Sequence, residues 1–200
     1  MSARLAKVTF GAALVTAPSL AQAHLVNSGL GPFYDGILHL LLSPADLLGL
    51  LAAILLAGLH GARASRLTVV VLPLAWFLAG LAGLALPAVL ELPWLSVLSF
   101  ALLGALVALN PKLPAEAVAL LAGLFGILHG LLNGSALAAI GAGWTSLLGI
   151  ALAVLVAALL VAAWVVTLRA AWARIAVRVA GSWVAAVGIL MFGWLTQGNV

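Results

Sequence analysis

The rest of the chain is predicted to be arranged around residues 36–61, GILHLLLSPADLLGLLAAILLAGLHG. This stretch contains His39 and Asp46, two of the few ionisable side chains of the protein, and a helix-start signal, SPAD, before an apolar run long enough to enter a bilayer. Residues 126–132, GILHGLL, repeat the beginning of this stretch and carry a further histidine, His129. Because the whole chain has only 4 histidines, this match is more informative than the leucine matches. We expect the two histidine-bearing segments to meet in the folded protein.

The composition indicates an integral membrane protein. Of the 200 residues, 66% are hydrophobic and 6% are charged, whereas a soluble domain carries about a quarter charged residues. The lack of cysteine excludes disulfides, thiolate metal sites and thiol catalysis. The net charge of +4 comes from basic residues at predicted helix ends, so it does not indicate nucleic-acid binding. Ser135 lacks a nucleophile-elbow context, and we expect no enzyme activity.

Residues 1–23 are predicted to be a signal peptide. A basic start and a short apolar run precede Ala21-Gln22-Ala23, which fits the small-x-small cleavage pattern. An uncleaved first helix is the alternative, but the apolar run before Pro18 is short for a membrane span. Cleavage would leave a transmembrane domain of residues 24–200, with a free amine beside the imidazole of His24.

An all-α fold with six transmembrane helices is predicted for the mature chain. The spans are residues 44–61, 67–87, 94–109, 115–140, 145–168 and 175–195, each close to or above the ~20 residues that cross a bilayer. A short helix before them, over residues 33–42, is expected at the outer surface. Ser43 is the predicted N-cap of the first span, and Asp46 is placed to close a capping box. Capping and metal binding are compatible, because a carboxylate has two oxygens.

Basic residues orient the predicted spans. The six Lys and Arg residues after residue 23 are expected in or beside the first, third and fifth loops: Arg63, Arg66, Lys112, Arg169, Arg174 and Arg178. Positive residues favour the cytoplasmic side, so both mature termini are expected outside. Trp94, Trp144 and Trp194 fall at the outer helix ends, as an aromatic belt would.

Two stripes run along the predicted fourth span. Gly126, Gly130 and Gly134 recur every four residues, and such a stripe lets a neighbouring helix approach closely. His129 and Asn133 form a parallel stripe, about 100° further round the helix. An ionisable residue inside a span suggests a function. The alternative is that His129 only hydrogen-bonds a neighbouring carbonyl and holds two helices together.

Imidazole, carboxylate and amide groups are expected to converge in the outer half of the membrane. His129 lies about 20 Å along its helix from the cytoplasmic end, at the depth where the first span begins. These ligand types suit Ni²⁺ or Co²⁺, whereas the absence of Cys and the presence of only 2 Met argue against Cu(I). The predicted metal ligands are His39, Asp46 and His129, with Asn133 in support and His24 at the mouth.

The motifs resemble those of the HupE/UreJ family of bacterial membrane proteins, which is associated with nickel supply to hydrogenase and urease. The resemblance covers nearly the whole chain and rests on three stretches: GLGPFYDG at residues 29–36, FYDGILHLLLSPADLL at 33–48 and FGILHGLLNG at 125–134. The family's first motif usually has Pro, an acid and a second His where this chain has Leu40, Ala45 and Asp46.

The resemblance implies an uptake permease for Ni²⁺ or Co²⁺ in the bacterial inner membrane, with no tightly bound cofactor. Two alternatives stay open. One is a non-transporting membrane accessory protein for metalloenzyme maturation, which would bind an ion without moving it. The other is a b-type cytochrome with His39 and His129 as axial ligands, which a Soret band would reveal. The residues leave open whether the chain forms a homo-oligomer or binds metalloenzyme maturation proteins.

The charge bias generates a topology prediction. A reporter fused after Val200 should be active only outside the cytoplasm, because the basic residues hold the first, third and fifth loops inside. Alkaline phosphatase and green fluorescent protein fusions at this position give opposite readouts. Fluorescence of the green fluorescent protein fusion, together with inactivity of the alkaline phosphatase fusion, would contradict the predicted orientation.

Overall fold

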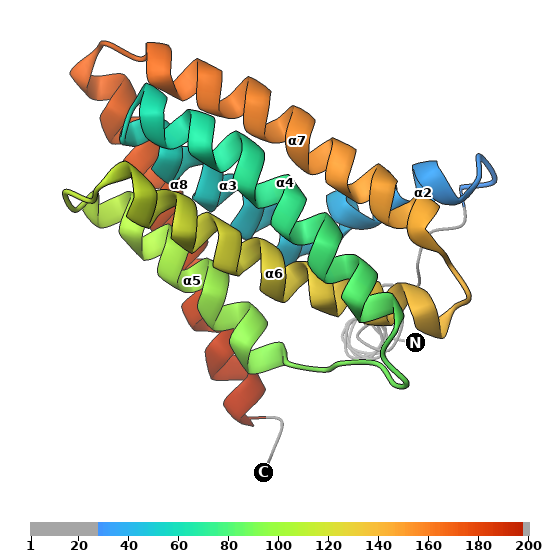
Figure 1. The fold of residues 1–200 in the computed structure, drawn as a ribbon. Coiled ribbons are helices and arrows are strands. Elements are labelled where there is room, and N and C mark those ends of the chain that lie inside the picture. The colour runs from blue at the N-terminus through green and yellow to red at the C-terminus, as the bar shows by residue number, and fades with distance from the viewer. Residues whose placement is uncertain (1–27, 198–200) are drawn as a thin grey trace, which may run out of the picture.

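The computed structural model describes residues 28–197 of the chain, so the predicted signal peptide and His24 lie outside the described residues. The described part is all-helical and contains seven α-helices (Figure 1). They are α2 (Pro32–Leu42), α3 (Pro44–Leu59), α4 (Ala62–Leu84), α5 (Pro93–Leu109), α6 (Ala115–Ala139), α7 (Trp144–Thr167) and α8 (Ala171–Gln197). The helix predicted before the first span is therefore present as α2.

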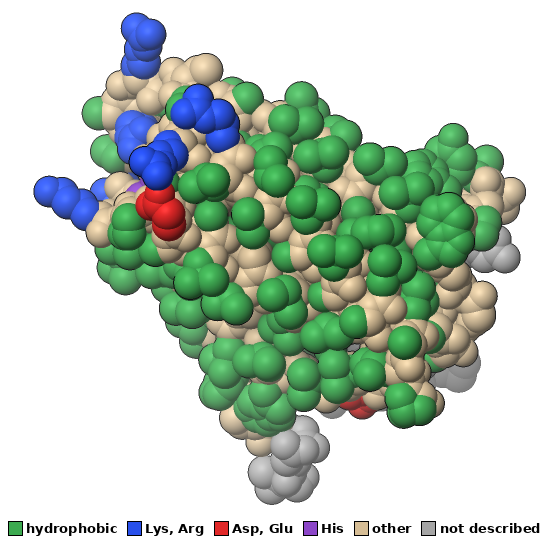
Figure 2. All heavy atoms as spheres, in the orientation of Figure 1, with side chains coloured by type: hydrophobic (Ala, Val, Ile, Leu, Met, Phe, Trp, Pro, Cys, Tyr) green, Lys and Arg blue, Asp and Glu red, His purple; other side chains and the backbone are tan. Residues whose placement is uncertain are grey.

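Four helices, α4, α6, α7 and α8, are long and apolar enough to cross a membrane. Helices α2 and α3 meet this criterion together but bend by 77° at their junction, as in a broken span or a re-entrant segment. Helix α5 is apolar but has only 17 residues. Large hydrophobic side chains cover the face of the molecule seen in Figure 2. The fold is thus that of a multi-pass membrane protein, while the count of six spans stays a prediction.

Two helices begin earlier than predicted, at Ala62 and Ala171. As a result Arg63 and Arg66 lie on α4, and Arg174 lies on α8, rather than in loops. Arginine does not end an apolar helix, because its long side chain can carry the charge from the helix end towards water. Lys and Arg side chains nevertheless gather at one end of the molecule, which we call the basic end (Figure 2).

The chain breaks between α2 and α3 because of Pro44. Ser43 adopts an extended backbone conformation, which is the conformation favoured before proline. The Ser43 side chain makes no capping hydrogen bond, and the Asp46 carboxylate bonds instead to residues of α6. The predicted capping box is therefore wrong. The polar groups of another helix compete successfully for the carboxylate, and the proline alone starts α3.

Helices α4 and α6 lie in close backbone contact, and the glycine stripe of α6 faces α4. A Cβ atom added at Gly126, Gly130 or Gly134 would clash with the carbonyl oxygens of Leu72, Trp76 and Gly80, respectively. Only glycine permits this separation of the two helices. With the glycine side of α6 fixed against α4, the adjacent side, which carries His129 and Asn133, faces α3 and α5.

The close packing generates a stability prediction. Gly130→Ala should lower the melting temperature of the detergent-purified protein, because its methyl group would overlap the Trp76 backbone. Overpacking of this kind costs about 1–3 kcal/mol. The matched control is Gly193→Ala on α8, where an added Cβ meets no atom within 4 Å. Equal melting temperatures for the two variants would contradict the close α4–α6 contact.

Candidate functional site

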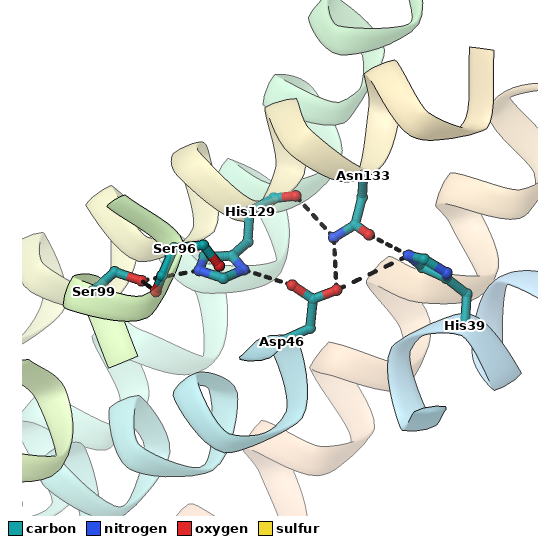
Figure 3. A network of polar contacts seen from close by, with 6 residues as sticks. All are labelled: His39, Asp46, Ser96, Ser99, His129 and Asn133. Carbon is teal, nitrogen blue, oxygen red and sulfur yellow. Dashed lines mark hydrogen bonds and ion pairs between the residues drawn. The ribbon is translucent and has the colours of Figure 1, made fainter. Parts of the chain in front are cut away.

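Polar side chains from four helices meet inside the bundle (Figure 3). We call this group the polar cluster; it consists of His39 on α2, Asp46 on α3, Ser99 on α5, and His129 and Asn133 on α6. His129 is completely buried, and Asp46 and Asn133 expose only 7% and 4% of their surface. A buried carboxylate and imidazole are costly in an apolar interior unless they are paired. The geometry of the cluster shows how each is paired.

The Asp46 carboxylate is held by α6 through both of its oxygens. Its Oδ1 accepts a hydrogen bond from His129 Nδ1 at 2.5 Å, and its Oδ2 accepts one from Asn133 Nδ2 at 3.1 Å. His39 Nε2 approaches Oδ2 to 4.0 Å from the other side. Both oxygens of the Asp46 carboxylate therefore have polar partners, and this is why α3 can bury the charge.

Asn133 connects the two histidine-bearing segments. Its amide nitrogen donates to Asp46 and also to the His129 carbonyl oxygen, at 2.8 Å. Its amide oxygen accepts from His39 Nε2 at 2.5 Å. An amide oxygen can only accept, so the proton of the His39 ring lies on Nε2 in this arrangement. Asn133 thus fixes the orientation of His39 as well as that of Asp46.

Ser99 is a member of the cluster that sequence reasoning missed. Its hydroxyl lies 3.0 Å from His129 Nε2 and 2.7 Å from the Ser96 carbonyl oxygen. Both ring nitrogens of His129 are therefore engaged. Phe125 stacks on the same ring at a centroid distance of 4.1 Å. A serine is common in apolar helices, and nothing in its spacing along α5 indicates that it faces a histidine.

Two other titratable groups near helix ends, Asp35 and His60, lie apart from the cluster. The Asp35 carboxylate accepts from the backbone N–H and the hydroxyl of Ser28. His60 lies between the carbonyl oxygens of Leu56 and Pro111, each 2.8 Å from one ring nitrogen. The repeated GILH segments do converge, because His39 of the first segment bonds to Asn133, which lies one helical turn beyond His129 of the second.

A cavity of about 350 Å³ leads to the cluster from the end of the bundle opposite the basic end. Of the cluster, His39, Asp46 and Asn133 line this cavity, whereas His129 lies behind them. The remaining wall comes from the α2–α3 junction, the loop between α4 and α5, and the first turn of α5. An ion or water molecule entering the cavity therefore meets His39 and Asp46 before it can reach His129.

In the described residues, 28–197, no group of three or more His, Asp or Glu side chains is arranged to hold a metal ion. In the polar cluster, hydrogen bonds occupy the groups that could bind a metal: both ring nitrogens of His129 are engaged, and His39 Nε2 faces an amide oxygen. Metal binding would require these hydrogen bonds to open. A haem between His39 and His129 would need the space that Asp46 and Asn133 fill (Figure 3).

A comparison with known proteins identifies the family of this chain. Residues 12–191 match the model of a family described as HupE / UreJ protein. No curated protein and no solved structure matches the chain. Since the match extends over nearly the whole chain, the protein belongs to the HupE/UreJ family, which points to transport of nickel or cobalt or to an accessory role in handling these metals.

Proposed function

We propose that the protein is an uptake permease for a divalent transition metal, Ni²⁺ or Co²⁺, in the bacterial inner membrane. One observation carries the proposal: two imidazoles, a carboxylate and an amide from three helices converge at the inner end of a cavity that opens away from the basic end. Ionisable groups inside a membrane protein usually serve a substrate or a proton. The donor types are those that borderline divalent ions prefer.

Distances within the cluster are compatible with a first binding step at the cavity. His39 and Asp46 both line the cavity, and His39 Nε2 lies 4.0 Å from Asp46 Oδ2. Two ligands that each lie ~2.1 Å from one ion are at most ~4.2 Å apart, so a single ion can reach both atoms. Nε2 of His39 can bind an ion only after the proton that it donates to Asn133 has moved to Nδ1 or left the ring.

His129 would join in a second step. Its Nδ1 bonds to Asp46, so Nδ1 can bind an ion only after its proton has moved to Nε2, beside Ser99, or, from the imidazolium form, has passed to water. Ion binding would therefore release protons, and acid would oppose it. A site in which hydrogen bonds compete with the ion binds less tightly than a preformed one. Moderate affinity suits a transporter, because the ion must leave again.

An accessory protein that binds metal without moving it is the second candidate. The observation that favours it is the packing behind His129, where Phe125 and Trp76 lie 4.1 Å and 5.8 Å from the imidazole, measured between ring centroids. These rings pack directly against the imidazole, and a protein that does not move the ion would leave them in place. The two candidates share the binding site and differ in whether the rings move aside.

The matched pair Asp46→Asn and Asp35→Asn tests the site. Both changes remove one carboxylate near the same end of the bundle, but Asp35 bonds to Ser28 and not to the cluster. We expect Asp46→Asn to reduce ⁶³Ni²⁺ accumulation by cells at least about tenfold, and Asp35→Asn to leave it unchanged. His129→Ala should abolish accumulation while the protein stays in the membrane. Acid should also oppose uptake, because a protonated imidazole cannot bind a metal.

Calorimetry on the purified protein separates the two candidates. A permease should bind Ni²⁺ or Co²⁺ and also raise the cellular metal content, whereas an accessory protein should only bind. Normal accumulation by both His39→Ala and His129→Ala would contradict the cluster as the site. A competition among Ni²⁺, Co²⁺, Zn²⁺ and Mn²⁺ in the same assay would identify the metal.

A further inference from the structure

We propose that Glu91 is the entrance ligand for the divalent cation, and that it captures the ion before His39 and Asp46 bind it. This inference rests on the proposed function of the polar cluster. Glu91 lines the same cavity as His39, Asp46 and Asn133, and its side chain is exposed. It therefore stands between solvent and the buried ligands.

The loop that carries Glu91 is fixed on both sides of this residue. The Leu90 backbone N–H donates to the Ser135 hydroxyl at 3.0 Å, and Ser135, which is 1% exposed, donates in turn to the Leu132 carbonyl oxygen. Ser135 is two residues beyond Asn133 on α6. On the other side, Pro93 begins α5. The backbone at Glu91 is therefore held next to the helix turn that forms the cluster.

Charge at the cavity favours a cation. The Lys and Arg residues of the described chain gather at the basic end, where α4 begins, and the cavity walls contain none of them. The ion pairs found among the described residues do not include Glu91; they join Arg63 to Glu116 and Asp46 to the two cluster histidines. Two carboxylates in one cavity without a neighbouring cation attract divalent ions and raise their local concentration.

Glu91 and Asp46 would then have different tasks. Glu91 is exposed, so its attraction for a cation is weak, long-ranged and reduced by salt. Asp46 is buried, so its interaction with an ion is strong and less affected by salt. Loss of the Glu91 charge should therefore weaken capture at low metal concentration and leave the maximal transport rate unchanged. A simple helix-end charge at the start of α5 would affect stability rather than capture.

The test compares Glu91→Gln with Glu116→Gln, Glu91→Asp and the wild type. Glu116 is an exposed carboxylate at the basic end, paired with Arg63, and serves as the control for a general loss of surface charge. Ni²⁺ uptake is measured against Ni²⁺ concentration at low and high ionic strength, and Ni²⁺ binding to each purified protein is measured by calorimetry. Melting temperatures report any structural damage.

We expect Glu91→Gln to raise the half-saturating Ni²⁺ concentration and the dissociation constant by roughly fivefold at low salt, with an unchanged maximal rate. The difference from wild type should shrink at high salt, and Glu91→Asp should restore most of the affinity. Glu116→Gln should behave like the wild type. Identical curves for Glu91→Gln and wild type, or the same change in Glu116→Gln, would overturn the entrance role. A lower melting temperature with unchanged affinity would do so as well.

These results are distinguishable from failure of the proposed function. If the wild type binds Ni²⁺ and His129→Ala does not, the polar cluster stands, whatever Glu91→Gln shows. If the wild type binds neither Ni²⁺ nor Co²⁺, the cluster is not a metal site and the entrance role fails with it.

Discussion

The structure depends on the buried carboxylate of Asp46 and on the two hydrogen bonds that it accepts from α6. Without these partners the charge would cost several kcal/mol in an apolar interior, so α3 and α6 must stay in contact at this point. His129 and Asn133 supply both bonds from one face of α6, four residues apart, which is one helical turn. The glycine side of the same helix fixes that face by packing on α4. One side of α6 therefore packs against α4, and the adjacent side of the same helix contributes to the polar cluster.

The break at Ser43 makes the cluster compact. His39 and Asp46 are seven residues apart, so on a continuous helix they would share a face but lie about 10 Å apart along the axis. Pro44 ends that continuity, and the 77° bend between α2 and α3 brings His39 Nε2 to 4.0 Å from Asp46 Oδ2. It also leaves room for the cavity, which is bounded by the bend and by the loop between α4 and α5. A single proline thus creates both the short distance and the access.

The two ends of the helix bundle differ in the charge of their side chains. One end carries the Lys and Arg side chains, and the cavity at the other end is lined by Glu91 and Asp46. Between them, Phe125 and Trp76 pack against His129. The cavity therefore reaches the cluster from the end that carries Glu91, and His129 itself is completely buried. Transport, as proposed above, would need a second state in which the aromatic rings move aside.

The membrane class, the helices to within a few residues, the family and four side chains of the polar cluster, His39, Asp46, His129 and Asn133, could be predicted from the sequence alone. Composition and the length of the apolar runs suffice for the first two, because a bilayer demands long apolar helices whatever they pack against. Rare polar residues in apolar spans mark the cluster for the same reason. Tertiary packing instead makes Asp46 bond to α6 rather than cap α3, places Ser99 beside His129, and brings Glu91 to the cavity wall. These contacts join residues 30 to 87 positions apart. A hydrogen bond over such a separation depends on how the helices pack, and spacing along one helix cannot specify it.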